Sequence, residues 1–219
     1  MVTVFLHMIT ADEIPGIGKV DLHSLPTQTV MELLVSDFQS KTDCFNDWDG
    51  SFLPFNRWPG VIIDDHSDVQ EISWVCGNYR YRDDSQFGGT FHFRYLPDSI
   101  TEANIRRNDF KGTINTIELP RGMQSLIASS NKLNGTLNVS SLPFEMKYLD
   151  LSDNELSGSL DLSALPRMFE KLLLDNNGLD ANPTKGHLSV VGWTSTPVLG
   201  EAKNLFKPLV VFLSWRRPY

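Results

Sequence analysis

Apolar and polar positions repeat with a constant period between residues 96 and 187. A Leu-Pro pair recurs every 23 residues, at Leu96-Pro97, Leu119-Pro120, Leu142-Pro143 and Leu165-Pro166. Between the pairs, an apolar residue recurs in step at Phe110, Leu133, Leu156 and Leu179. Self-similarity at a fixed period of this length is the signature of a solenoid, in which each repeat forms one coil and stacks on its neighbours.

Each repeat contains an alternating stretch that is typical of a short strand. In the third repeat Leu149 and Leu151 are two residues apart, so they face the same side and point into the solenoid. Tyr148, Asp150 and Ser152 then point outward. The same spacing predicts a right-handed, curved solenoid of about five coils, with short parallel strands near 69–74, 101–106, 124–129, 147–152 and 170–175.

Asparagine recurs after each predicted strand of the array, at Asn108, Asn131, Asn154 and Asn177. An amide side chain can donate to one buried backbone group and accept from another. We therefore expect these residues to form a structural ladder that pairs backbone groups of neighbouring coils, which would otherwise be buried without partners. Gly158 follows at a position where a tight bend with positive φ is expected.

The third repeat carries a recognisable family pattern. Met146-x-x-Leu149-x-Leu151-x-x-Asn154-x-Leu156 matches the leucine-rich repeat pattern LxxLxLxxNxL, and residues 96–180 resemble that family. The extension LxGxLxLxxLP resembles its plant and protist subclass. The resemblance implies an α/β fold, namely a curved solenoid with a parallel β-sheet on the concave face and little helix on the convex side. It also implies a protein-interaction module.

Residues 1–68 are predicted to form an N-terminal extension and cap. Residues 29–48 fit an amphipathic helix, with Met31, Leu34, Val35 and Phe38 on one face. The later Trp58-Pro59-Gly60-Val61 resembles the cap of plant-type leucine-rich repeat proteins, which covers the apolar end of the stack. That family usually carries a cysteine on either side of this motif, and this chain has Asn56-Arg57 and Ile62-Ile63 there instead.

The repeat region is predicted to span residues 69–182. Its first coil has the strand spacing of Val69, Ile72 and Trp74, followed by an insertion at 75–86 that mixes aromatic and charged residues. Inserted loops of this kind often carry function, although a solvated loop is the simpler interpretation. Residues 183–219 break the period and are expected to form a C-terminal cap or tail, in which PLVVFLSW (208–215) covers the last coil.

The charge of the chain is concentrated at its N-terminal end. The net charge of the 219 residues is −8, and residues 1–66 alone hold ten acidic and three basic residues. An acidic chain is a poor electrostatic match for nucleic acid or an anionic membrane, so no nucleic-acid partner is expected. A solvated acidic surface is the simpler interpretation of the cap, and a basic partner docking on it is the more specific one.

Targeting and redox signals are weak. No apolar run is long enough to span a membrane. The N-terminus has no basic region before its short apolar run, which does not fit a signal peptide and favours an intracellular location. Cys44 and Cys76 lack metal or redox spacing, and the sequence leaves open whether they pair or stay free. It does not indicate an oligomeric state.

No catalytic motif stands out, so no catalytic residue, cofactor or metal is predicted. Asp64, Asp65 and His66 form a polar cluster, but acidic turn residues are more often solvated than metal-bound. The main hypothesis is a non-catalytic module that binds a protein partner through its concave face. The alternatives are an enzyme or its regulatory domain, with a site in the N-terminal region or the insertion, and a structural subunit of a large assembly.

The outward positions of the predicted strands are the candidate partner-binding residues. They combine charged, polar and apolar side chains, as protein-binding surfaces do, although a solvated face remains the alternative. The candidate residues are Glu102, Asn104, Arg106, Ser125, Ile127, Tyr148, Asp150, Asp153, Lys171, Leu173 and Asp175. Tyr148 is central among them, because aromatic residues often anchor binding.

Overall fold

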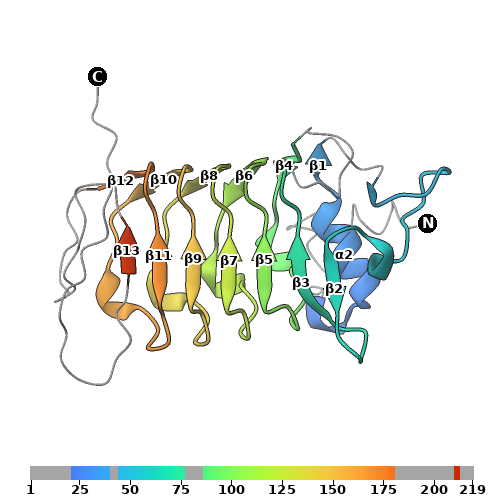
Figure 1. The fold of residues 1–219 in the computed structure, drawn as a ribbon, viewed down its shortest axis with the longest axis horizontal. Helices are drawn as coiled ribbons and strands as arrows, with labels where there is room; N and C mark the ends of the chain where they lie inside the picture. Colours follow the sequence, from blue (N-terminus) through green and yellow to red (C-terminus); the bar gives the residue numbers. More distant parts are fainter. Residues whose placement is uncertain (1–20, 40–43, 77–85, 181–209, 213–219) are drawn as a thin grey trace, which may run out of the picture.

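Two β-sheets run along the length of the molecule in the computed structural model (Figure 1). The structure describes residues 21–39, 44–76, 86–180 and 210–212. The larger sheet has the order β13-β11-β9-β7-β5-β3-β2 and the smaller one β1-β4-β6-β8-β10-β12. From β5 to β11 and from β6 to β12, successive strands of one sheet start 23 residues apart in sequence. Each coil of the array therefore contributes one strand to each sheet, and the predicted solenoid is confirmed.

The larger sheet contains the five strands predicted from the repeat, with β2 (Val61–Ile63) added at one end and β13 (Val210–Phe212) at the other. The five predicted strands are β3 (Val69–Ser73), β5 (Glu102–Asn104), β7 (Ser125–Ile127), β9 (Tyr148–Asp150) and β11 (Lys171–Leu173). From β3 to β13 the pairing is parallel, and Tyr148 lies between Ser125 and Lys171 at the 23-residue offset. β2 pairs with β3 in the antiparallel direction.

The smaller sheet and the short helices complete each coil. Its strands are β1 (Phe38–Gln39), β4 (Gly88–Thr90), β6 (Asp109–Thr113), β8 (Lys132–Gly135), β10 (Glu155–Gly158) and β12 (Gly178–Leu179). In the array, single turns of 3-10 helix follow this sheet, as the resemblance implied. They are η4 (Phe93–Tyr95), η5 (Thr116–Glu118), η6 (Val139–Ser141) and η7 (Leu162–Ala164).

The core lies between the two sheets, where apolar side chains from the strands of both sheets point inward. Leu126, Leu149 and Leu172 are stacked in register in the larger sheet and are at most 1% exposed. From the smaller sheet, Phe110, Leu133, Leu156 and Leu179 are also buried. Ala103 stands where the later repeats have leucine, and it is buried at the same place in the core.

The four repeated asparagines connect the coils behind the larger sheet. The Nδ2 of Asn131 donates to the carbonyls of Ile105 (2.9 Å) and Ala128 (3.1 Å), and its Oδ1 accepts from the Phe110 amide (3.1 Å). The corresponding bonds in the other coils are made by Asn108, Asn154 and Asn177. All four are buried, so each satisfies backbone groups that water does not reach.

The strands of the larger sheet are shorter than the predicted six residues, and β5, β7, β9 and β11 have three each. Hydrogen bonds between coils continue past the strand ends, for example from the Ile105 amide to the Ile127 carbonyl (2.8 Å). The chain then turns at a residue with positive φ immediately before each ladder asparagine. These residues are Arg107, Ser130, Asp153 and Asn176.

The N-terminal cap differs from the helix predicted over 29–48. Helix α2 covers only Thr27–Val35, preceded by η1 (Leu22–Ser24). Phe38, predicted on the helix, lies in β1, where it pairs with Gly89 of β4. Its buried ring contacts Phe110 at 4.7 Å between centroids, inside a cluster that includes Trp74 and Phe87. The prediction failed because the apolar residue that ends the helical pattern belongs to the sheet.

The predicted insertion and tail lie largely outside the described residues. Only Val75, Cys76 and Gln86 of the insertion are described. Of the C-terminal region 183–219, only β13 is described, and it pairs in parallel with β11 at one end of the larger sheet. Cys44 and Cys76 are partly buried and are not joined by a disulfide bond. Within the described residues, no helix is both long and apolar enough to cross a membrane.

Candidate functional site

The outward side chains of β3, β5, β7, β9 and β11 form two parallel columns on one surface, because the strands pair without slips in register. The first column is Glu71, Glu102, Ser125, Tyr148 and Lys171, and the second is Ser73, Asn104, Ile127, Asp150 and Leu173. We call this surface the strand face. It also includes residues that follow the strands, namely Arg106, Ser129, Ser152, Asp153 and Asp175. All eleven candidate residues belong to it.

Tyr148 and Lys171 interact in the first column. The Lys171 Nζ lies 5.3 Å from the centroid of the Tyr148 ring, within the range of a cation–π contact. Tyr148 is half-buried, and this burial, together with the charge of Asp150, raises the pKa of its hydroxyl. The ring is therefore held in place by its neighbour while part of it stays accessible.

Asp150 in the second column does not stand in solvent as the alternation of the strand predicted. It is only 9% exposed, and its Oδ1 accepts hydrogen bonds from the Ser152 amide (3.1 Å) and hydroxyl (2.6 Å). Ser129 and Ser152 are buried as well. The outward positions of a strand in the middle of a sheet are flanked on both sides, so short side chains there are covered by longer neighbours. Ile127 and Leu173, on either side of Asp150, stay partly exposed.

The charges of the strand face are mixed along its length. Glu71 and Glu102 lie at the same end as the exposed Arg106. Lys171 lies at the other end, where Asp150 ends β9 and Asp153 and Asp175 follow β9 and β11. Burial raises the pKa of the Asp175 carboxyl, and the nearby negative charges of Asp153 and Asp150 raise it further. The Asp153 Oδ1 accepts a hydrogen bond from Asn176 Nδ2 at 2.8 Å. A cationic ligand group near β11 would relieve this repulsion.

The candidate residues predicted from the sequence did not include those of β3. Glu71 and Ser73 extend both columns by one coil, since β3 pairs in register with β5. The spacing of Val69, Ile72 and Trp74 was the signal for this strand, but the outward residues between them were not considered as part of the face.

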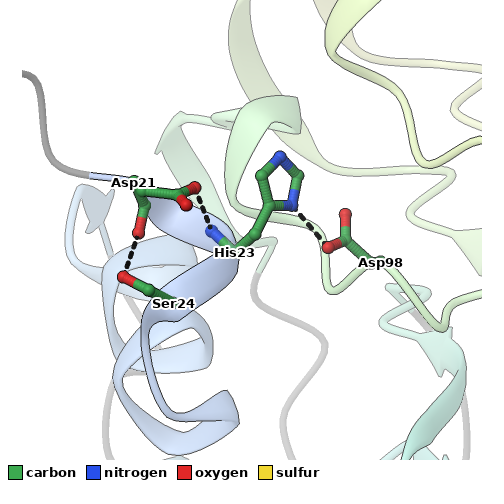
Figure 2. Close-up of polar contacts among 4 residues, drawn as sticks. All are labelled: Asp21, His23, Ser24 and Asp98. Carbon is green, nitrogen blue, oxygen red and sulfur yellow. Dashed lines mark hydrogen bonds and ion pairs between the residues drawn. The ribbon is translucent and has the colours of Figure 1, made fainter.

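A groove of about 1040 Å³ lies between the cap and the Leu-Pro turns of the first two repeats. Leu22, Arg94, Ile117 and Arg121 are among its lining residues. His23 reaches across from η1 towards Asp98 (Figure 2), and its Nδ1 lies 2.5 Å from the Asp98 Oδ2. The hydrogen bond and the negative charge of Asp98 raise the pKa of His23. The contact ties the cap to the array.

The Asp64 cluster has a structural role. The Oδ1 of Asp64 accepts from the amides of His66 and Asp68, both at 2.9 Å, and its Oδ2 accepts from Gln70 Nε2 at 3.0 Å. The bond from the Asp68 amide is the main reason that the pKa of Asp64 is lowered. The carboxylate therefore organises the turn between β2 and β3. Among the described residues, no three His, Cys, Asp or Glu side chains are grouped as metal ligands.

No protein-family profile and no curated protein matches the chain. Solved leucine-rich repeat structures are similar to it. The BIR2 ectodomain from Arabidopsis thaliana has a TM-score of 0.54 at 22% identity, covering 70% of this chain and 81% of that one. The structure of PEPR1-AtPEP1 has a TM-score of 0.56 at 21% identity, over 70% of this chain and 21% of that one.

A third similar structure is the Arabidopsis receptor kinase HAESA in complex with the peptide hormone IDA and the co-receptor SERK1. Its TM-score is 0.52 at 19% identity, over 70% of this chain and 30% of that chain. At this level of identity the likeness concerns the fold. The 23-residue period, the paired sheets, the asparagine ladder and these neighbours together show that the chain folds as a leucine-rich repeat solenoid, similar in fold to these plant structures.

Proposed function

We propose that this chain is a non-catalytic module that binds a protein or peptide through its strand face. The observation that carries the proposal is the pair of columns, which places Tyr148 beside Ile127, Asp150 and Leu173 on one rigid surface. Such a surface offers apolar contact area at its centre and charge towards its ends, the arrangement that protein-binding sites use.

The rigidity of the face favours binding. Its strands are fixed by parallel ladders, by the buried asparagines and by the core behind them, so the backbone loses little freedom when a partner docks. A solenoid also offers a long surface rather than a closed pocket. The complex of HAESA with a peptide hormone and a co-receptor shows that a protein of similar fold assembles with such partners.

Tyr148→Ala tests the proposal. The first step is capture of partners from an extract of the source organism by the immobilised wild-type chain, with quantitative mass spectrometry. The affinity of each recovered partner is then measured for the wild type and for the variant. Loss of a central aromatic anchor costs about 2 kcal/mol or more in binding. The melting temperature should change little, because the Tyr148 side chain lies outside the core.

Glu155→Ala is the matched control, since Glu155 is exposed on β10 of the other sheet. It should bind like the wild type. If Tyr148→Ala also keeps wild-type affinity for every partner, the strand face is not the binding surface and the proposal fails.

A further inference from the structure

The N-terminal cap presents one aromatic side chain to solvent on a tight turn. Trp48 is 93% exposed, far more than Trp58 (2%) or Trp74 (0%) in the same part of the fold. It belongs to a short hairpin, residues 45–53, which we call the Trp48 turn. Isolated exposed apolar residues are common on proteins, so the argument rests on how this turn is built.

The backbone of the Trp48 turn is fixed by its sequence. The Gly50 amide donates to the Asp47 carbonyl (2.9 Å), which closes a β-turn with Trp48 and Asp49 at its centre. Gly50 has φ +82°, a conformation that glycine adopts readily after such a turn. The Asp47 amide donates to the Ser51 carbonyl (2.7 Å), and Asn46 and Phe52 form an antiparallel bridge.

The base of the turn is anchored in the core. Phe45 is fully buried and packs against Trp58 and Trp74, with ring centroids 4.8 and 5.2 Å away. Phe52 packs on Trp58 at 5.9 Å, and the Trp58 indole nitrogen donates to the Leu53 carbonyl at 2.8 Å. Trp48 is therefore held out on a rigid support, which lowers the entropy lost when a partner binds it.

The residues before and after Trp48 in the chain carry carboxylates that are only partly used within the turn. The Asp47 Oδ1 accepts from the Trp48 amide (2.7 Å), and the Asp49 Oδ1 accepts from the Ser51 amide (2.9 Å) and hydroxyl (2.6 Å). Among the described residues, the Oδ2 of neither aspartate receives a hydrogen bond. The bonds from Ser51 lower the pKa of Asp49, so this carboxylate is ionised at neutral pH.

We propose that the Trp48 turn is a second docking site, separate from the strand face, for an arginine-bearing segment of a partner protein. A guanidinium group stacks on an aromatic face more readily than an ammonium group, and tryptophan gives the strongest cation–π contact. The same group pairs with carboxylates through two parallel hydrogen bonds. The turn carries an exposed indole and, on the residues before and after it in the chain, two carboxylates, so it offers both kinds of interaction. The net negative charge of residues 1–66 attracts a basic partner.

The test uses a phage-displayed random peptide library selected on the immobilised wild-type chain. Peptides that bind the Trp48 turn should share an arginine and should lose at least about tenfold in affinity for Trp48→Ala. Lysine in place of that arginine should weaken binding. Asp47→Asn with Asp49→Asn should also weaken it and reduce its dependence on salt, while both acceptor oxygens of the turn are kept.

Tyr148→Ala separates this site from the strand face. Peptides that bind the Trp48 turn should bind Tyr148→Ala as tightly as they bind the wild type. The failure of this proposal can therefore be distinguished from the failure of the proposed function. Trp48→Ala should have the melting temperature of the wild type, because the indole is almost fully exposed. The proposal is overturned if selection yields no arginine-containing peptides, if Trp48→Ala binds them equally well, or if Trp48→Ala lowers the melting temperature.

Discussion

At the scale of single residues, the asparagine ladder makes a polar contribution to stability. Asn131→Ala removes the acceptor of the buried Phe110 amide and one of the two asparagine donors to the carbonyls of Ile105 and Ala128. We expect a loss of roughly 1–3 kcal/mol in the free energy of unfolding, measured by urea denaturation. Asn134→Ala, at an exposed position of the adjacent strand, should unfold at almost the wild-type midpoint. Equal midpoints for the two variants would contradict the role of the ladder.

Asp175 gives a pH-dependent prediction. Its pKa lies above the ordinary 3.8 because of burial and the charges of Asp153 and Asp150, so the folded state binds this proton more tightly than the unfolded state does. Ionisation therefore lowers stability as the pH rises from 3.8 through the raised pKa. Asp175→Asn should raise the urea midpoint at neutral pH, and the gain should shrink below pH 3.8. A gain that is independent of pH would exclude charge repulsion as its cause.

The inward-pointing residues could be predicted from the alternation of apolar and polar residues, because residues two apart in a strand face the same side of the sheet. How exposed the outward residues are could not be predicted. Asp150 is buried because Ile127 and Leu173 flank it and Ser152 satisfies its carboxylate, and these contacts come from neighbouring coils. The exposure of Trp48 was missed for a related reason, since a helix was expected where the chain forms a turn.

At the scale of elements, the pairing of β1 with β4 depends on one glycine. Gly89 has φ +90°, and a Cβ there would lie 1.9 Å from the Asp37 carbonyl oxygen. Gly89→Ala must therefore separate the cap from the first coil, and we expect a loss of at least about 2 kcal/mol in the free energy of unfolding. Gly122→Ala is the control, since no atom lies within 4 Å of its added Cβ. Similar denaturation midpoints for the two variants would refute this packing.

The contact between His23 and Asp98 makes the attachment of the cap sensitive to pH (Figure 2). Because the folded-state pKa of His23 is raised, its contribution is fully present below the ordinary value of 6.5 and is lost as the pH rises through the raised pKa. The protection factors of the amides of η1 and the start of α2, which correct for the intrinsic pH dependence of exchange, should therefore decrease by a small factor across this range. Both groups are exposed, so the effect is modest.

Asp98→Asn is the control for this contact, because it removes the charge and keeps a similar shape. In this variant the His23 resonance should titrate at a lower pH in an NMR experiment, and the pH dependence of exchange in η1 should decrease. An unchanged His23 titration would show that Asp98 is not its partner in solution.

At the scale of the whole molecule, the architecture followed from the 23-residue period. Each coil buries one apolar residue from each sheet only when it is stacked on the next coil, so a sequence with this period has few other ways to form a core. The strand limits depend on turns whose positive-φ residue changes in type from coil to coil. The short cap helix and the place of Phe38 depend on packing between distant segments, which leaves no periodic signal in the sequence.

Methyl NMR of the chain with a bound partner tests the strand face most directly. Ile127 and Leu173 report on this face, and Ile117 reports on the edge with the Leu-Pro turns. If the strand face binds the partner, the methyl signals of Ile127 and Leu173 should shift strongly, and those of Ile117 should stay in place. Shifts confined to Ile117, with Ile127 and Leu173 unchanged, would contradict the account.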